Sequence, residues 1–340
     1  MNLLFAADPA VKTEVETGGF WMPGQFSTAA ADIDWAYFVV LWISFILMVP
    51  ICAIVGYLVW KYRRKRPDQE AEPSPAHNTA LELGWTIPTI PIVTVIFYVG
   101  VHGFVDARTM PKNAYEISVK AMKWNWTFEY PEGVITGELH VPANRNVVLT
   151  MRSDDVLHAM YIPVLRVKQD VVPGRFTKLW FNATKPVEAN LFCAEYCGDN
   201  HSGMITKFVA HDQAGFDKWF ADEKNWKNWK MKNADGTERP YTKEEAGEKF
   251  YRQRGCMGCH SVDGSVKTGP SFKGIFGSER DYTSKEGAGR VVADENYIRE
   301  SIVDPNAKIR ATFQPAMPSF KGQFRDDEMD TIIAYLKTLK

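Results

Sequence analysis

The first third of the chain contains two long apolar runs that carry no charged residue. They read AYFVVLWISFILMVPICAIVGYLVW at 36–60 and WTIPTIPIVTVIFYVGVHGFV at 85–105. As helices rising about 1.5 Å per residue, both are long enough to cross a bilayer core about 30 Å thick. Pro50, Pro88 and Pro91 interrupt them, and buried core helices are the alternative interpretation. We predict two membrane spans, at 36–60 and 85–105.

The polar segment between the runs predicts how the hairpin is oriented. KYRRKR at 61–66 follows the first run directly, and clusters of Lys and Arg stay on the cytoplasmic side of a membrane. A proline-rich stretch, PDQEAEPSPAHN, completes the turn. We therefore expect a transmembrane hairpin over 35–106, with residues 1–34 and the chain after 106 outside the cytoplasm. The apolar LLFAA near the N-terminus lacks a basic start, so its processing stays open.

After the hairpin, the pattern changes to short β-leaning segments separated by Gly, Pro and Asn. These segments occupy 114–130, 146–153, 159–168, 175–183 and 204–211. Such spacing is typical of antiparallel strands that pack as a sandwich or barrel. We predict a β domain over 107–212.

From residue 213 the periodicity becomes helical. QAGFDKWFADEKNWKNWK predicts a helix and MKNADGTERP a linker, which together make 213–241 a connecting segment. Residues 242–340 contain three helical stretches, EEAGEKFYRQRG, 294–303 and 326–340, and we predict an all-α domain there. The net charge of -1 gives no argument for a nucleic-acid partner, and five cysteines are few for a disulfide scaffold.

The C-terminal domain carries CMGCH at 256–260, the attachment signature of c-type haem. Two thiols at this spacing add to the haem vinyl groups, and the adjacent histidine then lies beneath the iron. A redox dithiol, a bare disulfide or a zinc ligand pair is the alternative. Met317, in QPAMPSF, is the expected sixth ligand, because methionine opposite histidine suits iron for electron transfer. The expected haem ligands and attachment residues are Cys256, Cys259, His260 and Met317.

The β domain contains a second cysteine motif, CAEYCGDNHSGM at 193–204. A disulfide, or tetrahedral zinc completed by histidines, is the simple interpretation. Neither accounts for Met204, because a thioether is a poor zinc ligand and a better ligand for the softer copper. Two thiolates and two histidines, His201 in the motif and His158 upstream, exceed the needs of one copper and suit two.

At this point the chain resembles subunit II of the haem-copper cytochrome c oxidases, specifically the caa3 type. The resemblance rests on SDDVLHAMYIPVLRVKQDVVPGR at 153–175 followed by CAEYCGDNHSGM. TGPSFKGIFG at 268–277 is similar to the cytochrome c loop that packs on the proximal histidine. The resemblance covers nearly the whole chain. It implies a membrane hairpin, a cupredoxin-like β domain with a dinuclear CuA centre, and a fused cytochrome c domain.

The resemblance also implies a ligand set for the CuA centre. One histidine would bind each copper, two cysteines would bridge both coppers, a methionine would be a weak axial ligand, and a glutamate would give its backbone carbonyl. The residues at those positions are His158, Cys193, Glu195, Cys197, His201 and Met204. The carboxylate of that glutamate is expected to help bind magnesium at the interface with subunit I.

Two further residues receive roles from the resemblance. Trp124, the first tryptophan of KWNWTFEY, would be the electron entry point, with an ordinary aromatic core as the alternative. Glu82, in LELGWTIP, would lie at the entry of a proton pathway, although a helix N-terminus also favours a solvated carboxylate. Asp155 and Asp170 are expected to hold the ligands or to face a partner subunit, with ordinary surface carboxylates as the alternative.

The implied function is that of an electron-entry subunit in a bacterial respiratory oxidase. Electrons would pass from haem c to CuA and on to haem in subunit I, where oxygen is reduced to water and protons are translocated. No catalytic residue for oxygen is expected in this chain. Expected partners are subunit I, other oxidase subunits, the lipid bilayer and a donor, either cytochrome c or a quinol-oxidising complex. Both termini and both extramembrane domains would be periplasmic in the cytoplasmic membrane of a bacterium.

Three alternatives remain at this stage. The same electron-transfer chemistry could serve a CuA-type nitric oxide reductase. A membrane-tethered haem sensor with a structural zinc or disulfide domain is an alternative of another class. A quinol oxidase subunit II is the third, although that branch usually lacks the copper ligands.

Overall fold

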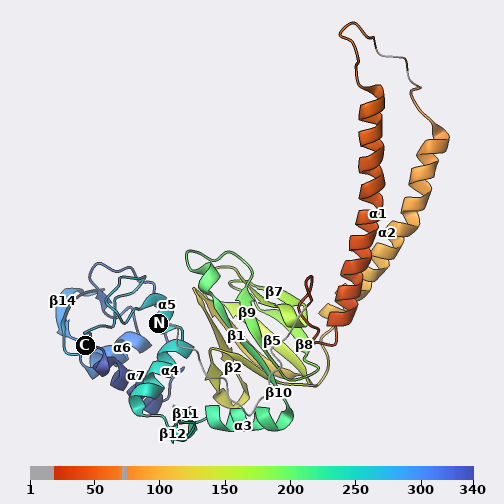
Figure 1. Ribbon diagram of the computed structural model, residues 1–340. Coiled ribbons are helices and arrows are strands. Elements are labelled where there is room, and N and C mark those ends of the chain that lie inside the picture. Colours follow the sequence, from red (N-terminus) through yellow and green to blue (C-terminus); the bar gives the residue numbers. More distant parts are fainter. Residues whose placement is uncertain (1–18, 71–72, 74, 234) are drawn as a thin grey trace.

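A hairpin of two long helices forms the N-terminal part of the computed structural model, which describes residues 19–70, 73, 75–233 and 235–340. Helices α1 (Ala30–Tyr62) and α2 (Thr79–Arg108) lie side by side and project away from the rest of the chain (Figure 1). Both are long and apolar enough to cross a membrane, and their apolar side chains are exposed rather than packed in a core. The apolar runs identified above fall inside these helices. The LLFAA stretch lies outside the described residues.

The β domain confirms the predicted sandwich and consists of two five-stranded sheets. The first has the order β3-β2-β1-β5-β8, with bounds Ile135–Thr136, Asn125–Glu129, Tyr115–Met122, Asn146–Ser153 and Thr177–Asn182. The second has the order β4-β10-β9-β6-β7, with bounds Leu139–Pro142, Ile205–His211, Val187–Cys193, His158–Ile162 and Val167–Val171. Most pairs are antiparallel, but β1 pairs with β5 and β4 with β10 in parallel, which the sequence pattern did not predict. Short 3-10 turns cover Pro131–Gly133, Pro163–Leu165 and His201–Gly203.

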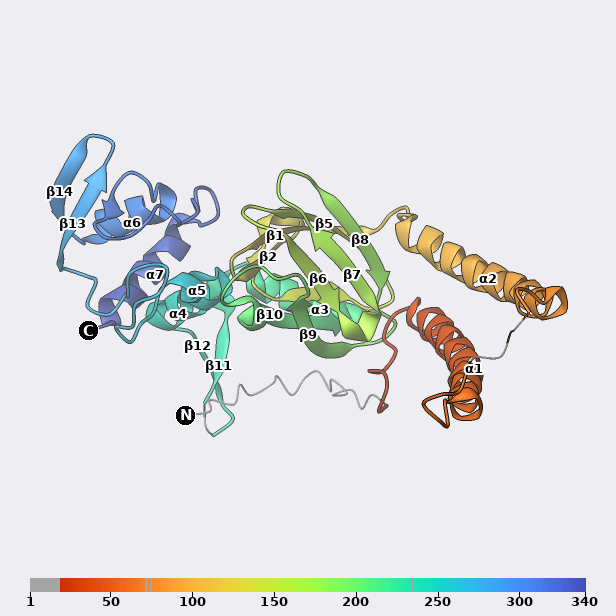
Figure 2. The same ribbon diagram turned by 90° about the horizontal axis from the view of Figure 1, so that it is seen from above.

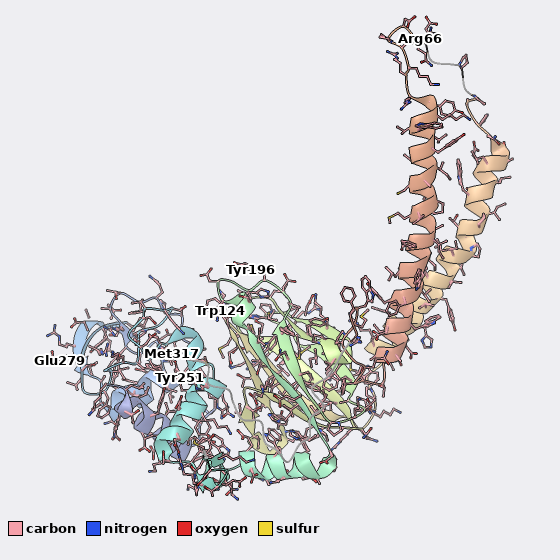
Figure 3. All side chains as sticks on the ribbon, in the orientation of Figure 1. Arg66, Trp124, Tyr196, Tyr251, Glu279 and Met317 are labelled. Carbon is pink, nitrogen blue, oxygen red and sulfur yellow. The ribbon has the colours of Figure 1, made fainter. Side chains whose placement is uncertain are left out.

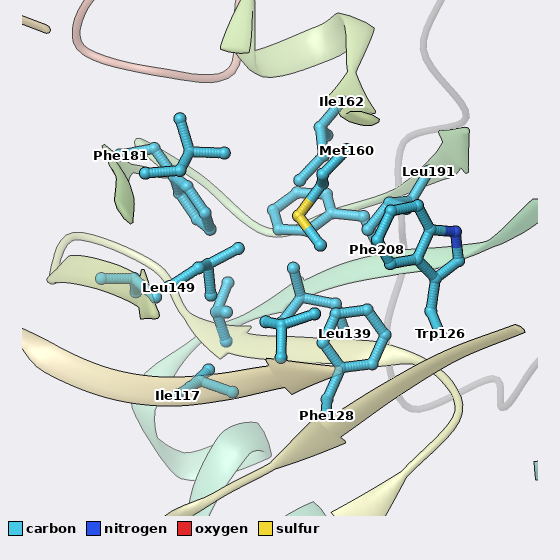
Figure 4. Close-up of a cluster of buried hydrophobic side chains, with 14 of the residues drawn as sticks. Ile117, Trp126, Phe128, Leu139, Leu149, Met160, Ile162, Phe181, Leu191 and Phe208 are labelled. Carbon is cyan, nitrogen blue, oxygen red and sulfur yellow. The ribbon is translucent and has the colours of Figure 1, made fainter. Parts of the chain in front are cut away.

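Side chains from the inner faces of the two sheets form one hydrophobic core (Figure 4). Trp126 and Phe128 on β2 are buried, which agrees with an aromatic core for that part of the KWNWTFEY segment. Trp124, two residues earlier, is only half-buried and lies at the edge of the core. The two tryptophans of this segment therefore have different environments.

The connecting segment starts with a helix that packs on the β domain. Helix α3 (Gln213–Glu223) contacts the sandwich through Phe216 and through Trp219, whose ring stacks on His140 at 4.2 Å. The helix is shorter than its sequence pattern suggested. A 3-10 turn at Trp226–Asn228 and a hairpin of β11 (Lys230–Lys232) and β12 (Glu238–Pro240) follow it. Trp226 and Trp229 belong to the core of the next domain.

The C-terminal domain has the predicted helices and, in addition, a small sheet (Figure 2). The helices are α4 (Lys243–Gln253), α5 (Cys256–Cys259), α6 (Glu295–Val303) and α7 (Asp326–Thr338). The sheet has the order β14-β13-β15, with bounds Gly287–Val292, Glu279–Ser284 and Ile309–Arg310. Helices α4 and α7 cross at Gly247, where any Cβ would overlap the carbonyl of Thr331. A glycine is therefore needed at the crossing.

Candidate metal and haem sites

Strand pairing brings His158 to the second cysteine motif, although the sequence separates them. Strand β6 begins at His158 and β9 ends at Cys193, and their antiparallel register pairs Met160 with Cys193. The loop after β9 then turns back, and the backbone N–H of Cys193 donates to the carbonyl of Met204 at 3.2 Å. This closes the motif into a compact loop beside the start of β6.

All six predicted copper ligands lie in one cluster. The two cysteine Sγ atoms are 3.8 Å apart and not bonded, and both cysteines are free. His158 Nδ1 lies 3.8 Å from Cys193 Sγ, and His201 Nδ1 lies 3.5 Å from Cys197 Sγ. The remaining two donors complete the cluster: Met204 Sδ is 3.9 Å from Cys197 Sγ, and the Glu195 carbonyl oxygen is 3.3 Å from Cys193 Sγ. Within it, the ligand atoms of His158, Cys193 and Cys197 all lie within 4.8 Å of one another.

A carboxylate orients His158. Asp155 Oδ1 lies 2.9 Å from His158 Nε2, which leaves Nδ1 to face the sulfurs. The same carboxylate accepts the backbone N–H groups of Lys123 and Val156. Burial raises the pKa of Asp155, but the hydrogen bonds from His158 and the backbone outweigh it, so the net pKa is lowered. Of the two aspartates, Asp155 contacts a predicted ligand, whereas Asp170 is exposed.

The two thiols differ in how readily they lose a proton. Burial raises the pKa of Cys193, but hydrogen bonds from His158 and from the backbone outweigh burial and lower it. Burial and the neighbouring Cys193 thiolate raise the pKa of Cys197. The second thiol therefore needs a cation beside it before it ionises. Two thiolates, two imidazoles and a buried thioether form a soft donor set, which fits copper better than zinc.

The CMGCH motif is arranged as a haem attachment site. Cys256 and Cys259 are free and lie at the two ends of α5. His260 Nδ1 lies 2.7 Å from the carbonyl oxygen of Pro270, and its ring stacks on Phe272 with centroids 4.3 Å apart. The ring is therefore held with Nε2 left available for a metal. Burial lowers the pKa of His260, which favours the neutral ligand form.

A cavity of about 740 Å³ is lined by Pro270, whose carbonyl oxygen faces His260 Nδ1. One wall is the loop that follows His260, including Lys267 and Pro270, and the opposite wall is residues 310–316, directly before Met317. Met317 itself is half-buried. The two thiols, His260 and Met317 are the groups that a covalently attached haem needs, and the cavity is lined by the chain segments that follow His260 and precede Met317.

Trp124 lies between the two candidate sites. A Cβ built on Gly198, in the cysteine loop, would be 3.2 Å from Trp124 Cζ2. A Cβ on Gly258, inside CMGCH, would be 3.9 Å from the Trp124 backbone nitrogen. Figure 3 shows Trp124 at the edge of the β domain that faces the domain containing Met317. Sequence reasoning named this tryptophan but not the glycines that let both loops approach it.

Glu82 is placed differently from these residues. It lies in the first turn of α2, where its Oε1 accepts the backbone N–H of Asn78 at 3.1 Å. The Asn78 side chain in turn accepts from the N–H of Leu81. This is a helix-capping arrangement, which is enough to explain a carboxylate here.

Fold and sites together define a class: a membrane-anchored electron-transfer protein with a copper-type β domain and a c-type haem domain. Family models for the transmembrane and periplasmic domains of cytochrome c oxidase subunit II match residues 16–104 and 134–210, and a cytochrome c model matches 244–340. Three relatives are each named cytochrome c oxidase subunit 2. The protein of Alkalihalophilus pseudofirmus is 30% identical over 87% of this chain and 83% of its own length. Those of Synechocystis and Bacillus subtilis are 32% identical (59% of this chain, 75% of theirs) and 28% identical (84% and 82%).

The chain belongs to the cytochrome c oxidase subunit II family, in the form that carries a C-terminal cytochrome c domain. It is therefore a subunit of a haem-copper oxidase, an oxidoreductase complex in which it associates with subunit I. The protein is membrane-anchored and has a periplasmic domain. Its domains are those that carry CuA copper and haem c in this family.

Proposed function

We propose that this chain receives electrons at its cytochrome domain and delivers them to the oxidase through its β domain. The observation that carries the proposal is the position of Trp124, which the loop of the copper-type cluster approaches at Gly198 and the haem attachment motif approaches at Gly258. With its indole beside Gly198 and its backbone nitrogen facing Gly258, Trp124 offers a short covalent and van der Waals path between the two loops. Trp124 is thus the proposed electron bridge.

Each metal group has its proposed holding residues. The CuA pair would be held by His158, Cys193, Glu195 through its carbonyl, Cys197, His201 and Met204. Haem c would be held by Cys256, Cys259, His260 and Met317. Both groups supply one-electron chemistry when bound. The protein contributes the soft donors, the carboxylate that orients His158, and the approach of both loops to Trp124.

The remaining expectations concern the surroundings of the chain. We propose that KYRRKR faces the cytoplasm, so that both termini and both extramembrane domains are periplasmic, with domain limits near 107–212, 213–241 and 242–340. The carboxylate of Glu195 is proposed to reach magnesium at subunit I, and Glu82 to lie at a proton entry. The donor is proposed to be a cytochrome c or a quinol-oxidising complex.

Metal analysis and spectroscopy of the purified complex test this function. Two coppers in this subunit for each haem c, a mixed-valence copper EPR signal and a low-spin haem c are expected. If the β domain of a complex supplied with excess metal contains one zinc, or no metal, the copper assignment is overturned. Comparing oxygen with nitric oxide as the electron acceptor separates the oxidase from a nitric oxide reductase.

Replacing Trp124 with leucine should slow electron transfer from haem c to CuA several-fold. The indole packs beside Gly198 of the cysteine loop while the Trp124 backbone faces CMGCH, and leucine would leave part of the space beside Gly198 without connecting atoms. Rapid mixing of the reduced donor with the complex measures the CuA absorbance change directly. Trp180→Leu is the control, because that half-buried tryptophan lies on β8 and its indole N–H donates to the carbonyl of Asp106 in α2. Equal rates in both variants would argue against the bridge.

Gly137→Ala should separate the two domains slightly and slow the same step. A Cβ at Gly137 would lie 2.6 Å from the backbone carbonyl oxygen of Gln253, which comes three residues before Cys256. Backbone cannot rotate away as a side chain can, so the cytochrome domain has to move. The spectra of both metal groups should stay normal while the interdomain rate falls.

Gly19→Ala provides the control, since a Cβ there meets only an ordinary contact at 3.9 Å. A Gly137→Ala complex that transfers electrons at the original rate would show that this contact does not set the distance between the domains.

A further inference from the structure

A second cavity lies between the β domain and the cytochrome domain, and none of the proposed metal ligands lines it. Its volume is about 460 Å³. One wall is the outward face of strands β1, β2 and β5, and the other is the loop at 319–323, directly after Met317. Both domains therefore contribute residues to one cleft.

The strand register places two adjacent rows of polar side chains on the β-domain wall of the cleft. Lys120 on β1 has Thr127 of β2 on one side and Arg152 of β5 on the other. The neighbouring row places Ser118 between Glu129 and Thr150. On β1, Ser118 and Lys120 alternate with the buried Val119, and all six of these polar residues line the cleft. The wall offers two cations, three hydroxyl groups and one carboxylate.

Positive charge in the cleft is only partly balanced. Asp154 forms ion pairs with both basic residues of the wall. Its carboxylate lies 2.8 Å from Lys120 Nζ and 3.8 Å from Arg152 Nε. The longer contact leaves the Arg152 guanidinium weakly engaged. Lys321, an exposed residue of the cytochrome loop, lines the opposite side. The cleft therefore contains three cations, Lys120, Arg152 and Lys321, against two carboxylates, Glu129 in its wall and Asp154 paired with Lys120. Both domains contribute positive charge to it.

This arrangement suits an anion that accepts several hydrogen bonds. A phosphate group takes charge-assisted bonds from Lys and Arg, and hydroxyl groups complete its remaining acceptor sites. Bound in the cleft, it would place a negative charge between Lys321 and the Lys120–Arg152 pair. The repulsion between the two domains would then become attraction.

We propose that the cleft is a binding site for a phosphate-bearing anion, which holds the cytochrome domain against the β domain. Because the same docked state places Trp124 between the two candidate metal sites, the anion regulates electron entry. This regulatory role rests on the function proposed above. Binding itself does not.

Calorimetric titration of the purified complex with pyrophosphate tests the site. Ionic strength is kept constant with chloride, so that screening does not change. Lys321→Gln should weaken pyrophosphate binding about tenfold or more, since the variant loses a charge-assisted hydrogen bond to the anion. Lys285→Gln is the matched control, because that exposed lysine lies at the tip of the β13–β14 hairpin, which points away from the β domain (Figure 2). Unchanged affinity in Lys321→Gln, or no binding to the original protein, overturns the proposal.

A charge reversal separates regulation from binding. Lys321→Glu should abolish pyrophosphate binding and should also make transfer from haem c to CuA fast without any anion, because the new carboxylate faces Lys120 and Arg152. In the original protein, pyrophosphate should speed this transfer more than chloride at equal ionic strength. If pyrophosphate binds but transfer does not occur at all, the electron-entry function fails while the site stands. If transfer occurs and no variant changes its response, the regulatory role fails.

ATP in place of pyrophosphate identifies the source of the phosphate group. Tighter binding of ATP would assign a nucleotide as the ligand, and equal affinity would assign an inorganic phosphate. Both results support the site.

Discussion

Cys197→Ser is expected to remove the dinuclear copper centre while leaving haem c in place. Cys197 Sγ lies within hydrogen-bonding distance of three other proposed donors, Cys193, His201 and Met204, so its loss affects the whole cluster. A serine hydroxyl is a hard donor that does not ionise readily and cannot bridge two soft metals as a thiolate does. Copper should fall to one atom or fewer per haem c, and the mixed-valence EPR signal should disappear.

The chain contains its own control for this experiment. Cys52 is exposed on α1 and remote from the motif, so Cys52→Ser should keep full copper content. Haem c absorbance should be normal in both variants, because CMGCH lies in the other domain. A Cys197→Ser protein that retains two coppers and the mixed-valence signal would contradict the proposed bridging role.

Arg166→Gln is expected to destabilise the junction between the membrane hairpin and the β domain. Arg166 donates to Asp34 on α1 through Nε at 2.8 Å and through Nη2 at 2.9 Å, and both side chains are buried. The same guanidinium donates to the carbonyls of Pro23, Gly24 and Pro163. Breaking a buried pair on one side leaves an uncompensated charge and costs about 3–5 kcal/mol.

Thermal loss of the CuA absorbance in the purified complex measures this effect. Arg175→Gln is the control, since Arg175 lies in an exposed turn between β7 and β8. The double variant Asp34→Asn with Arg166→Gln should be less destabilised than the sum of the two single variants, because no unpaired charge remains. Additive effects, or a normal transition in Arg166→Gln, would show that the pair does not hold the two parts together.

Motifs that are local in the sequence were predictable from it. The apolar runs of the hairpin and CMGCH are each recognisable within a short stretch, and CAEYCGDNHSGM together with 153–175 carried the family resemblance that implied the copper ligands. The strands 146–153 and 205–211 also follow local patterns closely. The small sheet of the cytochrome domain was not predicted, because its strands are exposed and mix charged residues with glycine.

The sequence by itself identified the residues that we propose to bind metal, because their types and the family resemblance that they carry lie in a few short stretches. Only the tertiary structure decided how they meet. The register of β6 on β9 brings His158 to the cysteine loop, and Asp155 then sets which imidazole nitrogen faces the sulfurs. The approach of Gly137 to Gln253 and the basic cleft around Lys321 join residues more than a hundred positions apart. Such contacts depend on strand pairing and domain docking, which no local pattern encodes.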